Sequence, residues 1–100
     1  MSVTTTVSAD KSEVTIHMTG RFDFSTHRDF VNAYKEHPKG EMAFIVDLKG
    51  ADYMDSSAMG MLLQLREYGK SGKDVCLING NDGIREILRI ANFDKLFTIE

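Results

Sequence analysis

An acidic residue and two adjacent serines, Asp55, Ser56 and Ser57, stand directly before an apolar run in the middle of the chain. These residue types could do three kinds of chemistry. The carboxylate or a hydroxyl could cap the start of a helix. A serine could act as a nucleophile, which requires a base within hydrogen-bonding reach and an oxyanion hole. A serine could also accept a phosphate and so change the charge of a docking surface.

The surrounding sequence argues against a nucleophile. The serines lie in MDSSAMG, which lacks the G-x-S-x-G elbow of serine hydrolases. The three histidines are poorly placed to act as the base. His17 falls in the middle of a predicted strand, and His27 and His37 fall in or at the end of the first predicted helix. No His, Cys or Asp cluster has metal-ligand spacing, and GNDG at 80–83 lacks the Lys-Ser/Thr of a phosphate-binding loop. We therefore expect no enzyme activity, no metal and no cofactor.

Length and charge limit the other classes of function. The chain has 100 residues and a net charge of −3, which suits one domain over residues 1–100. No basic block indicates a nucleic-acid partner. No apolar run approaches the roughly 20 residues that span a bilayer, no signal-peptide pattern begins the chain, and the single cysteine allows no internal disulfide. We expect a cytoplasmic protein without direct membrane insertion, and a monomer.

Hydrophobic periodicity predicts an α/β fold with the order ββαβαβα(β). Strands are expected at 3–8, 14–19, 42–48, 74–79 and 97–99, and helices at 26–37, 57–68 and 84–91, with a loop at 49–56. The strand–helix–strand unit from 42 to 79 implies a parallel pair with a right-handed crossover. Because the first two strands form a hairpin, the expected sheet of four to five strands is mixed but mostly parallel, with helices packed on it.

The position of the acidic and hydroxyl residues matters more than their composition. They fall where a buried parallel strand ends and a helix begins, which is where open α/β sheets bind ligands. Free N–H groups and the helix dipole favour an anion there. A plain cap and a phosphorylated docking switch both remain open. For the switch, we expect at least one of Met54 and Met59 to be exposed beside Ser56 as an adaptable contact.

Three stretches of the sequence together resemble STAS domains of the anti-sigma factor antagonist family. They are FIVDLKGADYMDSSAMGMLLQL at 44–65, VTIHMTGRFDFSTHRDF at 14–30 and GKDVCLINGNDGIREILRIANFDKLFTI at 72–99. The first is similar to the family's strand, loop and D-S-S-G/A-x-G helix start, and the second contains its G-x-[LF]-D element. Ala58 stands where many members have glycine, and Arg21 where many have an acidic residue.

The resemblance implies a switch based on partner exchange. The unphosphorylated form would bind an anti-sigma factor of the serine-kinase type, and phosphorylation of Ser56 would block binding. A PP2C-type serine phosphatase, in some relatives part of one regulator, would reverse it. The implied outcome is sigma-factor release, which is transcription regulation, or control of a motility or biofilm circuit. The implied partner surface comprises Asp23, Met54, Asp55, Ser57 and Met59.

An alternative remains from the same resemblance. The chain could be a STAS regulatory subunit of a transporter or of a sensory assembly that is not phosphorylated.

Overall fold

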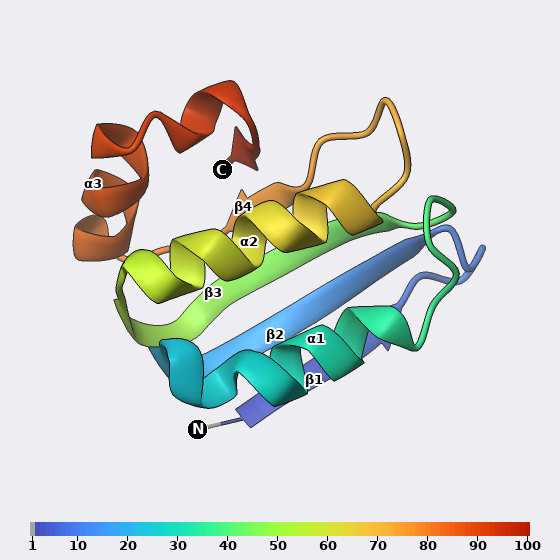
Figure 1. Cartoon of the computed structure of the whole chain (residues 1–100), viewed down its shortest axis with the longest axis horizontal. Coiled ribbons are helices and arrows are strands. Elements are labelled where there is room, and N and C mark those ends of the chain that lie inside the picture. Colours follow the sequence, from blue (N-terminus) through green and yellow to red (C-terminus); the bar gives the residue numbers. More distant parts are fainter. Residues whose placement is uncertain (1) are drawn as a thin grey trace.

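Runs of alternating β-branched and apolar residues form the strands, and the one-sided apolar stripes form helices. The computed structural model describes residues 2–100 (Figure 1). The strands are β1 Ser2–Val7, β2 Glu13–Phe22, β3 Ala43–Met54, β4 Cys76–Ile78 and β5 Thr98–Ile99. The helices are α1 His27–Lys35, α2 Ser56–Tyr68 and α3 Asp82–Ile90, with short 3-10 turns η1 Phe24–Thr26 and η2 Phe93–Lys95. The predicted α/β class and element order are confirmed.

The connections between strands place the three helices on one face of the sheet. The strand order is β1-β2-β3-β4-β5, with β1 antiparallel to β2 and all other pairs parallel. Each crossover moves one place in the same direction, so right-handed connections put α1, α2 and α3 on the same side. Figure 1 shows α1 and α2 lying across that face. Within residues 2–100, no helix is both long and apolar enough to cross a membrane.

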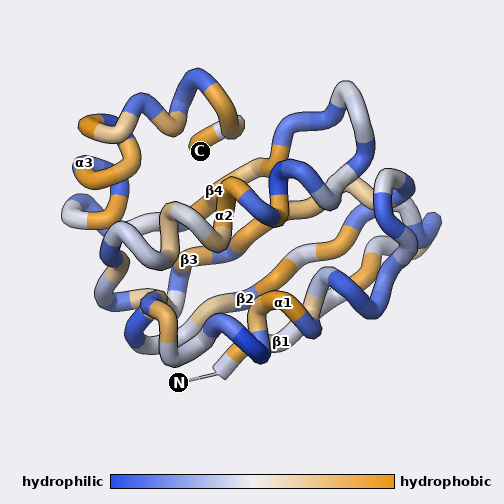
Figure 2. Tube along the Cα trace, in the orientation of Figure 1, coloured by the Kyte–Doolittle hydropathy of each residue, from blue (hydrophilic) through white to orange (hydrophobic). Residues whose placement is uncertain are grey.

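The core lies between the sheet and the helices. On β2 and β3, alternate residues are fully buried and point towards the helices, among them Val14, Ile16, Phe44 and Val46. Figure 2 shows these strands as hydrophobic stretches interrupted by polar positions. The helices contribute Phe30, Tyr34, Ala58, Met61, Leu62, Leu65, Ile84 and Leu88. Burial of these apolar side chains is the main favourable contribution to folding.

The opposite face of the sheet carries a row of hydrogen-bonded polar side chains. His17 Nε2 lies 2.9 Å from Thr6 Oγ1, and its Nδ1 lies 3.0 Å from Asp47 Oδ2. Asn79 Nδ2 and the Lys49 N–H donate to Asp47 Oδ1, each at 3.0 Å. The row spans β1 to the end of β4, so polar groups on the face without helices are paired rather than left unsatisfied.

The middle strands run further than the sequence predicts. Residues 49–54, expected in a loop, continue β3 and pair in parallel with Thr19–Phe22 of an equally extended β2, with two register irregularities. Gly50, which suggests a loop in the sequence, instead allows the strands to approach. A Cβ there would lie 2.6 Å from Thr19 Cγ2. Conversely, the strand expected at 74–79 is only Cys76–Ile78, and the first helix ends at Lys35.

Candidate functional site

The extended β2 and β3 bring two aspartates to the same end of the sheet, where these parallel strands have their carboxyl ends. Phe22 and Met54, the last residues of these strands, are partners in the parallel register. Asp23 and Asp55 therefore follow neighbouring strand ends, one before η1 and the other before α2. Figure 1 shows η1 and the start of α2 at the same end of the sheet.

Asp55 caps α2. Its Oδ1 accepts hydrogen bonds from the Ser57 N–H at 3.0 Å and the Ala58 N–H at 3.3 Å. The Ser57 hydroxyl donates to the same oxygen at 2.5 Å. Of the three cap candidates in the sequence, the structure selects the aspartate, which contributes about 1 kcal/mol to stability. Ser57 is held by it as an accessory hydroxyl.

Asp23 forms the same turn on the neighbouring strand end. Its Oδ1 accepts from the Ser25 N–H at 3.0 Å and from the Ser25 hydroxyl at 2.5 Å. The Ser25 hydroxyl, with a smaller contribution from Arg21, lowers the pKa of the Asp23 carboxyl from its ordinary 3.8. Asp23–Phe24–Ser25 and Asp55–Ser56–Ser57 are thus equivalent turns, and Phe24 and Ser56 occupy the same middle position.

Ser56 is the first residue of α2 and is exposed. Within residues 2–100 its hydroxyl has no hydrogen-bond partner, unlike the hydroxyl of Ser57. Ser56 is therefore the one residue of the Asp55–Ser57 turn whose side chain is exposed and forms no hydrogen bond that stabilises the turn.

The methionines differ from expectation. Met54 is only 2% exposed, because at the end of β3 it is the register partner of the fully buried Phe22. The expectation that Met54 contributes to an exposed surface is therefore wrong. Met59 is half-buried and packs against the core, so it offers only part of its side chain at the surface.

Phe24 is an exposed aromatic residue at the same end of the sheet, and the sequence pattern does not indicate a functional role for it. Its side chain is 67% exposed and stacks on His27 with ring centroids 4.9 Å apart. In the sequence Phe24 follows the buried Phe22 at a spacing of two residues, so only the turn geometry shows that it points outward. This end of the sheet therefore presents an exposed aromatic side chain on one turn and the free hydroxyl of Ser56 on the neighbouring turn.

Gly60 and Leu63 extend the exposed side of α2 beyond Ser56. A Cβ at Gly60 would meet no atom within 4 Å outside its own helix backbone, so packing within residues 2–100 does not require glycine there. Glycine within a helix is less stable than alanine by roughly 0.5–1 kcal/mol. Leu63 is 39% exposed. We call Ser56, Gly60 and Leu63, spaced at helical intervals, the α2 strip.

Arg21 places a positive charge beside the two turns. Its guanidinium lies 3.8 Å from the centre of the Tyr53 ring, and its Nε donates to Asp23 Oδ2 at 3.3 Å. Arg21 and Tyr53 are register partners at the ends of β2 and β3. The arginine is thus held in place by a cation–π contact and an ion pair rather than extending freely into solvent.

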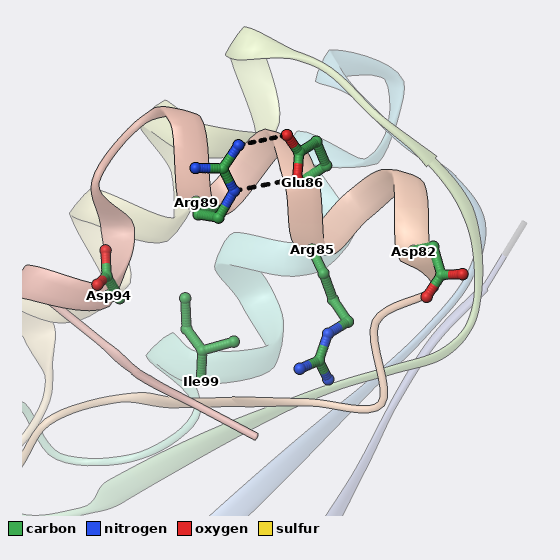
Figure 3. A pocket seen from close by; sticks show the side chains of 6 residues that line it. All are labelled: Asp82, Arg85, Glu86, Arg89, Asp94 and Ile99. Atoms are coloured by element: carbon green, nitrogen blue, oxygen red, sulfur yellow. Dashed lines mark hydrogen bonds and ion pairs between the residues drawn. The ribbon is translucent and has the colours of Figure 1, made fainter.

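A cleft of about 460 Å³ lies elsewhere, between α3 and the C-terminal segment (Figure 3). It is lined by Asp82, Arg85, Glu86, Arg89, Asp94 and Ile99. Arg89 pairs with Glu86, whereas the Arg85 side chain points away from that pair (Figure 3). The lining supplies carboxylates and arginines but no serine, cysteine or histidine, and it does not include Ser56. Residues 2–100 hold no group of three or more His, Cys, Asp or Glu placed to bind a metal.

Comparison with known proteins identifies the family. The family model described as "Mlab, STAS domain" matches residues 5–98. A STAS-domain containing protein of Pseudomonas aeruginosa (strain UCBPP-PA14) is 45% identical over 100 residues, covering 99% of both chains.

Solved structures show the same fold at lower identity. The anti-sigma factor antagonist SpoIIAA in its unphosphorylated form is 18% identical with a TM-score of 0.69, over 99% of this chain and 87% of that one. An anti-sigma factor antagonist from Mycobacterium paratuberculosis is 17% identical with a TM-score of 0.75, over 98% of this chain and 85% of the other. The chain therefore belongs to the STAS domain family and has the fold of the anti-sigma factor antagonists.

Proposed function

We propose that this protein is a phosphorylation-controlled protein-binding switch and that Ser56 accepts the phosphate. The observation that carries the proposal is the division of roles in the Asp55–Ser57 turn. Asp55 caps α2 and holds the Ser57 hydroxyl, whereas the exposed Ser56 hydroxyl holds nothing. A kinase could therefore modify Ser56 without breaking a bond that maintains the fold.

A phosphate at Ser56 would change the surface rather than the fold. It would add roughly −1.5 to −2 charges at the N-terminus of α2, where the helix dipole and N–H groups favour an anion. The same end of the sheet already carries the carboxylates of Asp23 and Asp55. A partner that covers this end of the sheet would have to desolvate the added charge, which is costly because the nearby cation, Arg21, is already paired with Asp23.

The proposed docking surface is the α2 strip together with Phe24, with Met59 beside it. Phe24 supplies an exposed aromatic anchor, a residue type enriched at the energetic centres of interfaces. Gly60 has no role in internal packing, and its missing side chain lets a partner approach the helix backbone closely. Asp23, Asp55 and Ser57 act by shaping the two turns that present Phe24 and Ser56.

The proposed partner is an anti-sigma factor of the serine-kinase type. Support comes from the family match and from the fold shared with proteins named anti-sigma factor antagonists. A PP2C-type serine phosphatase would regenerate the binding form. On this proposal the chain works in the cytoplasm without a catalytic activity of its own, and it controls sigma-factor release or a motility or biofilm circuit.

Phosphorylation with matched alanine variants tests the acceptor. Incubation with the cognate serine kinase and ATP should add one phosphate to the wild type and to Ser57→Ala, detected by intact mass. Ser56→Ala should remain unmodified. Modification of Ser56→Ala at the wild-type rate would refute the assignment, whatever the result for Ser57→Ala.

Partner binding provides the second test. Ser56→Asp should weaken the complex with the kinase-type regulator, measured by calorimetry, whereas Ser56→Ala should retain it. Purification of the tagged protein from native cells should recover a kinase-like or phosphatase-containing regulator. Recovery of an ABC-type ATPase or permease would instead favour the role of a transporter subunit.

A further inference from the structure

The outer edge of the sheet is an unprotected strand. β1, Ser2–Val7, has β2 on one side, and within residues 2–100 no other strand lies on its other side. Its sequence SVTTTV contains no charge and no proline, and all its residues except the half-buried Val3 are exposed. Soluble proteins usually protect such edges with charged residues, prolines, bulges or a covering segment.

The hydrogen-bonding phase of the hairpin shows which backbone groups point outward. The Ser8 N–H donates to the Glu13 carbonyl at 2.9 Å, and Val7 is the register partner of Val14. In an antiparallel pair, hydrogen-bonded positions alternate along the strand. Residues 2, 4 and 6 therefore direct their N–H and C=O groups towards β2. Val3, Thr5 and Val7 direct theirs away from the sheet.

We propose that β1 pairs with β1 of a second copy of this chain, antiparallel and centred on Thr5. The outward groups are spaced symmetrically about Thr5, so the edge is complementary to itself. Val3 pairs with the partner's Val7, Thr5 with the partner's Thr5, and Val7 with the partner's Val3. Each of these is a position at which antiparallel strands exchange two hydrogen bonds.

A hollow beside the edge supports a second copy as the occupant. About 230 Å³ of space lies between β1 and α1, lined by Val3, Thr4, Thr5, Asp29, Asn32, Ala33 and Glu36. The proposed register places the partner's Val7 opposite Val3 on the helix side, at this hollow. Val7, which is 41% exposed in the single chain, would thereby gain an apolar contact in each copy.

The pairing is expected to be weak and strengthened by salt. A single strand pair buries an area at or below about 1,200 Å², the low end for specific interfaces. Asp29 and Glu36 line the hollow in each copy, so carboxylates of the two copies approach one another. Salt screens such repulsion between exposed charges.

Sedimentation velocity of the full chain, extended to millimolar concentration, tests the pairing. The wild type should shift from monomer to dimer as concentration rises, and more so at high salt. Thr5→Pro removes the central outward N–H but no bond to β2, a change that edge strands tolerate, and should remain monomeric. The control Thr5→Val keeps the N–H and should dimerise. A wild type that stays monomeric, or a folded Thr5→Pro that dimerises like the wild type, would overturn the proposal.

Amide signals in NMR give a test that does not depend on the proline variant folding. The Val3, Thr5 and Val7 amides should shift and exchange more slowly with solvent as wild-type concentration rises. The Thr4 and Thr6 amides, which point towards β2, serve as internal controls and should be protected at all concentrations. Outward amides that are insensitive to concentration would refute the pairing. Because the pairing does not involve Ser56, its failure would leave the proposed phosphoswitch untouched.

Discussion

At the scale of single residues, neighbouring hydroxyls have different tasks. Ser57 is bound to the carboxylate of Asp55, and so is Ser25 to that of Asp23, with the same 2.5 Å separation. The residue between aspartate and serine is exposed in both turns and is free to vary without loss of the turn. One turn places a phenylalanine there and the other a serine. This end of the sheet therefore offers an apolar contact and a hydroxyl that can be modified.

This division predicts unequal effects on stability. Asp55→Ala should lower the free energy of unfolding by about 1 kcal/mol, within a range of 0.5–2, because the α2 cap is lost. Ser56→Ala should change it by less than about 0.5 kcal/mol, as is usual for exposed sites without bonds. Urea denaturation measures both. A loss for Ser56→Ala as large as for Asp55→Ala would show that Ser56 helps to hold the helix.

The single thiol should react slowly. Cys76 is half-buried rather than fully buried, and its Sγ lies 3.0 Å from Glu100 Oε2. Burial and, secondly, Glu100 raise the pKa of Cys76 from 9.0 to about 11. The thiolate fraction falls about a hundredfold, and the greater nucleophilicity of a more basic thiolate recovers about tenfold of the rate. Alkylation at pH 8 should therefore be about tenfold slower than in the urea-unfolded chain. Glu100→Gln should accelerate it, and an unchanged rate would contradict this role of Glu100.

At the scale of elements, two glycines answer opposite needs. A Cβ at Gly60 on α2 would meet nothing within 4 Å, whereas one at Gly50 on β3 would lie 2.6 Å from Thr19 Cγ2 and 3.0 Å from the Met18 carbonyl oxygen. Gly50 is required by the close approach of β2 and β3. Gly60 is not required by the packing of residues 2–100.

Alanine at each glycine should therefore have opposite effects. Gly60→Ala should raise the free energy of unfolding by about 1 kcal/mol, the helix-propensity difference, and should weaken the complex with the proposed partner. Gly50→Ala should be destabilising, because the Cβ overlaps a neighbouring strand. Thermal melts of the two variants, followed by binding measurements on Gly60→Ala, decide this. A Gly60→Ala variant that binds at full strength would remove Gly60 from the docking surface.

The hydrogen-bonded carboxylate of Asp47 on β3 predicts a specific loss of stability in acid. Burial alone would raise the pKa of Asp47, but hydrogen bonds from Asn79, the Lys49 N–H and His17 hold it below its ordinary 3.8. A lowered folded pKa stabilises the fold above the unfolded value, and this contribution is lost as the pH falls through the folded pKa. Asp47→Ala should cost about 1–3 kcal/mol at pH 7, and its difference from the wild type should shrink below pH 3.8.

Urea denaturation at neutral and acid pH measures this convergence. Asp52→Ala provides the control, because Asp52 is an exposed carboxylate on the same strand. As a substitution at an exposed site, it should stay within about 0.5 kcal/mol of the wild type. If the Asp47→Ala deficit stays constant down to the acid limit, the lowered pKa is not its source.

At the scale of the whole molecule, periodicity predicted the class and order of elements but not how far the central strands extend. Lys49, Gly50 and Asp52 are residues typical of loops, and only pairing with the equally extended β2 makes them a strand. That extension buries Met54, which local pattern placed at the surface, and it brings Asp23 beside Asp55. The exposure of Phe24 also depends on this long-range pairing, so it could not be derived from its neighbours in sequence.

The cap on α2 has a consequence for the lifetime of the protein. The carboxylate that secures the helix and the hydroxyl proposed to carry phosphate belong to different residues, Asp55 and Ser56. Phosphorylation would therefore leave the cap in place, and the favourable interaction of the phosphate with the N-terminus of α2 would make the modified form at least as resistant to unfolding as the unmodified form. Proteases that capture unfolded chains would then not remove the modified form faster. The ratio of the two forms in a cell would then be set by the kinase, the phosphatase and the synthesis of new, unmodified chains, and not by selective loss of the phosphorylated form.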